Sequence, residues 1–344
     1  MSKITPFAAA LVVAVSGSVL ASEHVAEVEQ IGTNNRAEQM QSGVMLRSYV
    51  LQNGAENRAL TDQAGTSGEG GQADIEQVGT LNVAEIYQVY GTRPDTASAA
   101  IYQVGTSNIA VLEQHERRDE FLATATVHQE GTGNRLNATQ GWVQNTLNVV
   151  SIGQNNVVDV IQTGFSTLQV QQTGTANQLK YENTTNYANA FAAVHQVGTA
   201  NQADIAQYSG RYPAGEVYLE QIGTANVAKI SSSSYATVDY IQQGTGNALD
   251  SYISGGPSSL VGSSEGDYNS VLASQFGDRN SLDIAQTGSF NQIEAYQELR
   301  SHGALITQAG DANQAFLMQG QSPTGHIASI VQSGNGNVAN VLQQ

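Results

Sequence analysis

The chain has 344 residues and a formal net charge of −17, with 13 Lys and Arg against 30 Asp and Glu, and it contains no cysteine. Phosphate binding needs clustered basic side chains, so this balance argues against a nucleic-acid partner, and without cysteine neither disulfides nor thiolate metal sites can form. Aromatic residues make up 6% and charged residues 12% of the chain, which does not fit a conventional large hydrophobic core. Chains rich in Gln and Asn are either disordered or stacked as β-structure through amide ladders.

The first segment, residues 1–21, has the pattern of a secretory signal peptide. Lys3 lies in a weakly basic start, an apolar run extends from Phe7 to Leu20, and cleavage is expected after Ala21. That run is too short for a good membrane anchor, and nothing later approaches eighteen consecutive apolar residues. We therefore expect an exported, soluble chain with no membrane span, in which residues 22–344 form one structural domain.

From residue 30 onward the motif Q-x-G-x-x-N recurs fourteen times, and its glycine and asparagine are present in every copy. The leading glutamine is present in twelve copies and is replaced by Ser151 and Ser264 in the other two. The glutamines are Gln30, Gln52, Gln77, Gln103, Gln129, Gln172, Gln196, Gln221, Gln242, Gln286, Gln308 and Gln332. The glycines are Gly32, Gly54, Gly79, Gly105, Gly131, Gly153, Gly174, Gly198, Gly223, Gly244, Gly266, Gly288, Gly310 and Gly334. The asparagines are Asn35, Asn57, Asn82, Asn108, Asn134, Asn156, Asn177, Asn201, Asn226, Asn247, Asn269, Asn291, Asn313 and Asn337.

Residues on both sides of each motif alternate with period two, which predicts two short strands per copy. The position two before the glutamine is aliphatic except at Tyr240 and Gly262, and the position two after the asparagine is always Ala, Val, Leu or Ile. Acids such as Glu27 and Asp74 fall on the opposite face of the strand. The second strand usually ends on another glutamine, at Gln41, Gln63, Gln88, Gln114, Gln140, Gln162, Gln207, Gln275, Gln297, Gln319 or Gln343.

Successive copies are 21 to 26 residues apart, and the extra length lies in the second connection, as at residues 91–95, 115–120 and 210–213. We therefore predict an all-β fold, a cross-β solenoid with two strands per coil and about 14 coils, in which equivalent residues stack about 4.8 Å apart. A buried unpaired amide costs about 1–3 kcal/mol, whereas an identical amide above and below supplies donor and acceptor. At the turn, glycine is expected to supply positive φ, and asparagine is expected to tolerate the left-handed region while bonding local backbone.

The unit A-x-I-x-Q-x-G-x-x-N-x-A-x-I-x-Q at Ala73 to Gln88 resembles the curlin repeat of bacterial curli fibre subunits, and the resemblance spans nearly all of residues 22–344. It implies a secreted, extracellular functional amyloid that leaves the cell through an outer-membrane pore. It also implies end-to-end joining with itself and other curlin subunits into cell-surface fimbriae that serve biofilm matrix, adhesion and aggregation. The family's amyloid-forming residues map onto the Gln, Gly, Asn and Ala columns. This chain has more repeats than family members typically carry, and its first coil, near His24 to Ala26, leaves no room for a Gly-rich export segment.

The first and last coils differ in charge. The last coil, Ala328 to Gln343, keeps the motif without any charged residue, so we expect it to expose a strand edge that templates another copy. The first coil carries Glu27, Glu29, Arg36 and Glu38, which we interpret as gatekeepers against unspecific pairing. These features predict head-to-tail growth at the Gln343 edge.

Neither a metal site nor a catalytic site is predicted. His128 and His195 hold outward positions before a motif glutamine, and the other four histidines lie in or near connections. The acids recur as outward positions rather than converging as a glycosidase pair, and no nucleophile or base constellation supports an enzyme or a cofactor. The segment Gly68 to Gly71 is a chance match to a calcium-binding β-roll, because its aspartate does not recur.

Two further readings concern the surface. Trp142 and the outward Tyr49, Tyr102 and Tyr218 fit ordinary surface packing, although such side chains also bind dyes or partners. The alternative function is a monomeric β-solenoid adhesin or an ice-binding-like surface protein. That alternative requires a flat outward face of regular Thr or aromatic residues and blocked ends, whereas outward positions here are expected to be irregular.

Overall fold

The structure is a computed structural model that describes residues 24–65, 71–89, 97–115, 123–141, 144–184, 189–208, 215–320 and 325–344. The predicted signal peptide lies outside these residues, as do Trp142, Gly68 to Gly70 and most of the inserted connections. The regular elements of the described residues are all β-strands, and none of those residues forms a helix long and apolar enough to cross a membrane.

The chain divides into two compact units between Asn156 and Val157. The first unit contains β1 (Val25–Thr33), β2 (Arg36–Ser42), β3 (Arg47–Ala55), β4 (Arg58–Ala64), β5 (Gln72–Thr80), β6 (Val83–Val89), β7 (Ser98–Thr106), β8 (Ile109–His115), β9 (Thr124–Thr132), β10 (Arg135–Gly141) and β11 (Asn145–Gln154). Its strands form two sheets, one of order β1-β3-β5-β7-β9-β11 and one of order β2-β4-β6-β8-β10.

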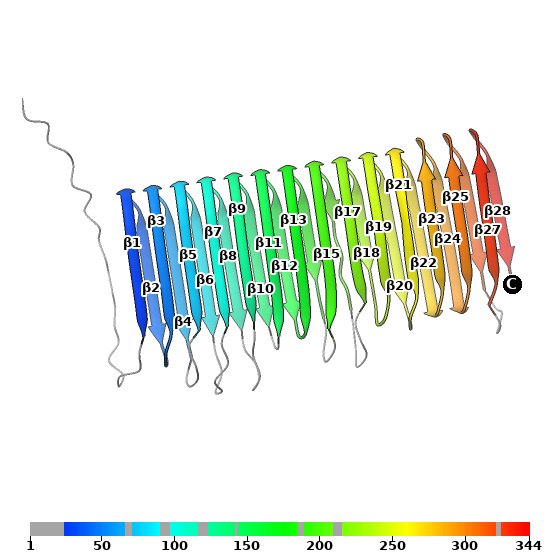
Figure 1. Ribbon diagram of the computed structural model, residues 1–344. Coiled ribbons are helices and arrows are strands. Elements are labelled where there is room, and N and C mark those ends of the chain that lie inside the picture. Colours follow the sequence, from blue (N-terminus) through cyan, green and yellow to red (C-terminus); the bar gives the residue numbers. More distant parts are fainter. Residues whose placement is uncertain are drawn as a thin grey trace, which may run out of the picture. The chain divides into compact units, whose positions relative to one another are not determined.

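The second unit repeats this arrangement. It contains β12 (Val157–Thr163), β13 (Ser166–Thr175), β14 (Gln178–Glu182), β15 (Ala190–Thr199), β16 (Gln202–Ala203), β17 (Glu216–Thr224), β18 (Val227–Ser231), β19 (Thr237–Thr245), β20 (Ala248–Ser254), β21 (Ser259–Asp267), β22 (Ser270–Asp278), β23 (Ser281–Thr287), β24 (Gln292–Arg300), β25 (Gly303–Ala309), β26 (Gln314–Gln319), β27 (Ile327–Ser333) and β28 (Val338–Gln343). Odd-numbered strands from β13 to β27 form one sheet and even-numbered strands from β12 to β28 form the other. Both units are therefore β-solenoids with two strands per coil, as predicted (Figure 1).

Pairing between coils is parallel and keeps the motif in register. In the first unit Gln30 pairs with Gln52 and Gly32 with Gly54. In the second unit Gln196 pairs with Gln221 in the same way. A slip of one residue would turn every buried side chain outward, so the alternating burial of each strand fixes this register.

The core of each coil is thin and lies between its two strands. Inward aliphatic residues such as Ile75 and Ile86 in the first unit and Val217 in the second are fully buried, and so are the inward amides of Gln77 and Asn201. Burial of polar amides beside small aliphatic residues is the packing that the composition required, because the chain has too few large apolar residues for a conventional core.

One coil departs from the predicted pattern. Its second strand, β16, has only two residues, and Ala206 and Gln207 have positive φ values of 68° and 39°. In the coil before it, Tyr181 fills an inward position and its hydroxyl donates a hydrogen bond to the Gln207 side-chain oxygen. The Gln207 oxygen thus accepts from a tyrosine of the preceding coil, whereas the equivalent oxygen of other coils accepts from a glutamine. In this coil β16 ends early.

Candidate assembly site

The motif glutamines form amide ladders inside both units. Wherever two glutamines are neighbours in this column, the side-chain nitrogen of one donates to the side-chain oxygen of the next coil, as from Gln52 to Gln77 and from Gln77 to Gln103, at 2.8 and 2.9 Å. The same direction holds in the second unit, where Gln196 donates to Gln221 at 2.8 Å. Because every donor points toward the C-terminal coil, the ladder has a polarity, and an additional coil must enter with the same orientation.

Each glutamine nitrogen also ties its sheet to the opposite one. The Gln52 nitrogen donates its second hydrogen to the carbonyl of Arg36, and Gln77 does the same to Arg58, at 3.1 and 3.0 Å. A second glutamine column, on the even-numbered strands, repeats the arrangement, with Gln63 donating to Gln88 at 2.8 Å. Both hydrogens of the Gln52 and Gln77 amides are used, so such buried amides cost little and hold the two sheets together.

The motif asparagines form a third ladder, which runs in the opposite direction. The Asn201 side-chain nitrogen donates to the oxygen of Asn177 at 3.1 Å and to the Gly223 carbonyl at 3.2 Å. The Asn201 oxygen in turn accepts from both the backbone and the side-chain nitrogen of Asn226, each at 3.1 Å. Aspartate lacks the donors and glutamine is one carbon longer, which explains why asparagine occupies this position in every copy.

Of the two roles expected for the asparagine, the bond to local backbone is confirmed, with the Asn201 side-chain nitrogen 3.1 Å from the Val197 carbonyl, whereas the expectation of a left-handed backbone was wrong. The residue with left-handed backbone is the one before it, such as Leu81, Ala200 or Ala225, with φ of 60°, 56° and 55°. The asparagine itself is absent from the positive-φ residues of the described motifs. It is selected for its side-chain bonds across coils rather than for backbone tolerance.

The motif glycines are required for two reasons. Their φ values lie between 100° and 137°, a region that side chains other than hydrogen rarely allow. In addition, a Cβ on Gly198 would stand 2.0 Å from the carbonyl oxygen of Gly223 in the next coil. The coils therefore approach each other more closely at the turn than any side chain permits.

Three residues of the second unit that depart from the repeat, Tyr240, Gly262 and Ser264, contact one another. Tyr240 replaces an aliphatic residue, and its ring lies 3.1 Å from the position of a Cβ on Gly262 in the next coil. The Tyr240 hydroxyl is 2.7 Å from the Ser264 hydroxyl, which donates to Gln286 at 2.8 Å. Burial raises the pKa of Tyr240, so the hydroxyl stays protonated. Tyrosine, glycine and serine together take the place of an aliphatic residue and a glutamine, and the Tyr240 hydroxyl instead of an amide leads through Ser264 to Gln286.

The second glutamine column is interrupted at three positions of the second unit, Asn183, Ser232 and Ile253, and Gln207 lies between the first two. Ile253 is buried and pairs with Gln275 in the next coil, but it has no donor to offer. The oxygen of Gln275 and the hydroxyl of Ser232 are consequently buried without a hydrogen-bond partner among the described residues. This defect follows from the polarity of the ladder.

The outer coils leave complementary groups unused. At the edge of β27 and β28, Gln332 and Gln343 donate to backbone carbonyls but meet no further amide in the described chain. At the edge of β1, the Gln30 nitrogen donates to Gln52 at 2.6 Å, while its oxygen meets no donor among the described residues. One edge thus presents amide donors in the columns where the other presents amide acceptors.

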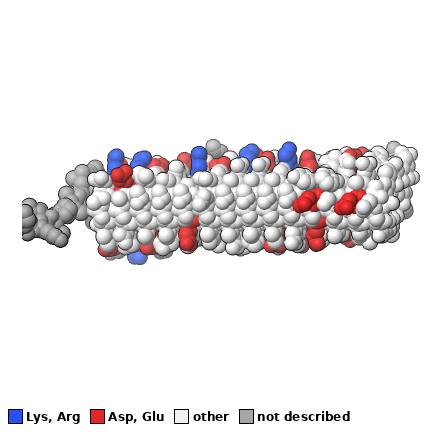
Figure 2. Space-filling view, turned by 90° about the horizontal axis from the view of Figure 1, so that it is seen from above, with Lys and Arg blue, Asp and Glu red and all other residues white. Residues whose placement is uncertain are grey.

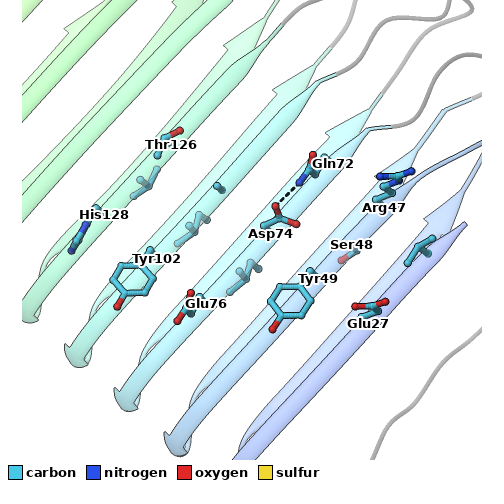
Figure 3. Close-up of a pocket in the computed structure, with 15 residues that line it drawn as sticks. Glu27, Arg47, Ser48, Tyr49, Gln72, Asp74, Glu76, Tyr102, Thr126 and His128 are labelled. Carbon is cyan, nitrogen blue, oxygen red and sulfur yellow. Dashed lines mark hydrogen bonds between the residues drawn. The ribbon is translucent and has the colours of Figure 1, made fainter.

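A shallow groove crosses the outer face of β1, β3, β5, β7 and β9 (Figure 3). Tyr49, Asp74, Glu76, Tyr102 and His128 line it. Partial burial, followed by the nearby acids, raises the pKa of Tyr49. The acids and tyrosines are outward-facing, as predicted, and the groove is open to solvent with a negative lining.

The edge that carries the motif turns has few charges over much of its surface (Figure 2). The residue after the motif glycine is often threonine, and these threonines pair between neighbouring coils: Thr80, Thr106 and Thr132 in the first unit, and Thr175, Thr199, Thr224 and Thr245 in the second. Outward positions were expected to be irregular, but the edge with the motif turns carries a regular row of threonines.

An alternating charge row on the even-numbered strands of the second unit was also missed. Asp159 pairs with Lys180, Lys229 pairs with Asp250, and Asp204 lies between the two lysines. The sequence signal was present in the third residue after each motif asparagine, but it appears only when the copies are aligned. Opposite charges on neighbouring strands favour this register.

The histidines lie apart from one another except at one place. His128 and His195 are outward, as predicted, and His195 lies 3.2 Å from Glu220. His302 and His326 are stacked, with ring centres 5.3 Å apart. In the described part of the chain, no three His, Asp or Glu side chains are grouped so that they could hold a metal ion.

No family model matches the chain, and no curated protein matches it. The curlin resemblance accordingly rests on the repeat itself.

Proposed function

We propose that this protein is a structural subunit that polymerises end to end into extracellular amyloid fibres of the curli kind, with a role in biofilm matrix, adhesion and aggregation. The observation that carries the proposal is the polarity of the ladders. Each coil offers the groups that the next coil needs, and the outer edges of β27 and β1 offer them to a second copy. The secreted location and the outer-membrane pore belong to the same proposal, supported by the predicted signal peptide.

The exposed last coil supports growth at this edge. Its inward residues Ala339, Val341 and Gln343 are partly exposed, whereas equivalent residues of inner coils such as Leu317 and Gln319 are buried. Ile327 and Val331 are 85% and 69% exposed. The last coil, Ala328 to Gln343, contains no Asp, Glu, Lys or Arg, so a second copy would cover it without burying a charged side chain.

A pair of neighbouring substitutions tests the proposal. Val341→Lys places an ammonium group in the inward column of the last coil, where a second copy would have to bury it, and we expect fibre elongation to stop. Asn340→Lys places the same group on the outward face of the same strand and should leave elongation nearly unchanged. Elongation of residues 22–344 onto wild-type seeds is followed by thioflavin fluorescence and electron microscopy, with circular dichroism to confirm that both variants keep their strands.

Equal elongation of the two lysine variants would contradict growth at the β28 edge. A wild-type chain that stays monomeric under all conditions would contradict polymerisation itself.

The threonine row favours one second candidate, a surface protein that binds an ordered polar surface, including ice, through its turn edge. A regular row of hydroxyl and methyl groups suits such a surface, because both present the same groups at a fixed spacing. Thr199→Lys in monomeric protein should abolish thermal hysteresis if this reading holds, whereas polymerisation should not depend on that side chain. Absence of thermal hysteresis in the wild type would remove this candidate.

A further inference from the structure

The residue six positions before each motif glutamine, or before the serine that replaces it, forms a column of its own on the side opposite the motif turns, at or just before the start of each odd-numbered strand. In the first unit this column includes Ala97 and Ala123, which are fully buried. In the outer coils it consists of histidine: His24 precedes β1, while His302 and His326 precede β25 and β27. The only histidines of this column, within the described residues, are therefore at the first coil and the last two.

Histidine here performs the ladder function that asparagine performs at the motif turns. The His302 backbone nitrogen donates to the Asn280 side-chain oxygen at 3.0 Å. The His326 backbone nitrogen donates in the same way to Nδ1 of His302 at 3.0 Å, and the rings stack at an angle of 17°. The other ring nitrogen of His302 contacts the Glu298 carbonyl. Nδ1 accepts and Nε2 donates, so His302 is bound as the neutral imidazole.

The first coil shows the same bond. The backbone nitrogen of Leu46 donates to Nδ1 of His24 at 3.2 Å. His24 is exposed and His326 half-buried, in contrast to His302, which is 1% exposed. Nε2 of His326 lies 3.2 Å from the Gly320 carbonyl, and Nδ1 meets no donor among the described residues. Nδ1 of His326 in the last coil is thus left as an acceptor for a partner. The backbone N–H group of His24 in the first coil is left as the matching donor.

We infer that a second copy of this chain docks with its His24 over His326, so that His302, His326 and the partner's His24 form one stacked column across the junction, and that assembly consequently requires neutral imidazoles. The His24 backbone nitrogen of the second copy would donate to Nδ1 of His326. The His24 carbonyl of the second copy would accept from the backbone nitrogen of Ile327, just as the His326 carbonyl accepts from the backbone nitrogen of Gly303 at 2.8 Å. This inference rests on the proposed end-to-end assembly.

Protonation places a hydrogen on Nδ1, where the next coil already presents an N–H group. The acceptor is lost, two donors face each other, and neighbouring imidazolium rings repel. Burial lowers the pKa of His302, as does His326, while the contact with the Glu298 carbonyl acts in the opposite direction. Acidic pH therefore works against the column.

The charges around the column do not reverse this effect. Its own turn carries Glu298 and Arg300, the preceding turn carries Asp278 and Arg279, and residues 320–326 contain no Asp, Glu, Lys or Arg. The second copy would add Glu27 and Arg47 from β1 and β3. Each acid is matched by an arginine on the same or the neighbouring element. The Glu298 carboxylate lies beside Gly320 and favours a cation there, but it supplies no acceptor for the N–H group that faces Nδ1.

The test compares seeded elongation of residues 22–344 at pH 7.5 and pH 5.5. The neutral fraction of a free imidazole falls about tenfold over this range, so elongation of the wild type should fall about tenfold. The variant with His24→Asn, His302→Asn and His326→Asn keeps a neutral acceptor of the kind that Asn280 provides. It should elongate at similar rates at both pH values.

A matched control replaces the outward histidines, His128→Asn with His195→Asn, and should retain the full pH dependence of the wild type. A wild-type rate that is equal at both pH values, or a pH dependence that persists in the triple asparagine variant, would overturn the histidine junction while leaving end-to-end assembly in place. Absence of fibres at both pH values would instead overturn the assembly.

Discussion

At the scale of single residues, the motif glycines are the positions with the least freedom. Gly198 combines a φ of 120° with a carbonyl oxygen 2.0 Å from the position of its missing Cβ. The obstructing atom belongs to the backbone of the next coil, so it cannot move aside as a flexible side chain would. Separation of the coils would break the ladder bonds on both sides of the turn.

We therefore expect Gly198→Ala to lower the free energy of unfolding by about 3 kcal/mol. Gly303→Ala is the matched control, because no atom lies within 4 Å of its Cβ position and its φ is not positive. Chemical denaturation monitored by circular dichroism measures both changes. Similar losses from the two substitutions would show that the close approach of the coils does not determine the glycine.

At the scale of the element, the repeat predicted the strands, their alternating burial and the parallel stacking, because each of these follows from residue type and period alone. The polarity of the ladders was not predictable, since the side-chain bonds of Gln52 and Asn201 run in opposite directions for geometric reasons that the sequence does not contain. The replacement of glutamine by Ser264 was visible in the sequence, but its dependence on Tyr240 and Gly262 became visible only when neighbouring coils were in contact. The histidine column was missed because its members lie in connections of unequal length.

The interrupted glutamine column gives a stabilising substitution at this scale. Ile253→Gln supplies a donor for the unpaired oxygen of Gln275 and an acceptor for the unpaired hydroxyl of Ser232. Each satisfied buried group is worth about 1 kcal/mol or more, which exceeds the loss of apolar burial, so we expect a net gain of about 1 kcal/mol in unfolding free energy. Ile253→Met fills a similar volume without hydrogen-bonding groups and should give no gain. A glutamine variant less stable than the methionine variant would contradict the ladder polarity.

At the scale of the whole molecule, charge opposes the association that the ladders favour. The chain carries a net charge of −17, and the acids lie mainly on outward positions, so two copies repel until the uncharged last coil meets its partner. Salt screens the repulsion, because it acts through solvent. Salt does not screen the ladder bonds, because they form between groups in direct contact.

Elongation of wild-type seeds should therefore accelerate several-fold when the ionic strength rises from about 0.01 M to about 0.1 M, as the screening length falls from about 30 Å to about 10 Å, and should then level off. Thioflavin kinetics at constant pH measure the rate. Val341→Lys should remain inactive throughout, because screening does not remove the cost of burying its ammonium group. A rate that falls with salt would mean that the charged first coil, with Arg36 beside three acids, attracts its partner rather than discouraging unspecific ones.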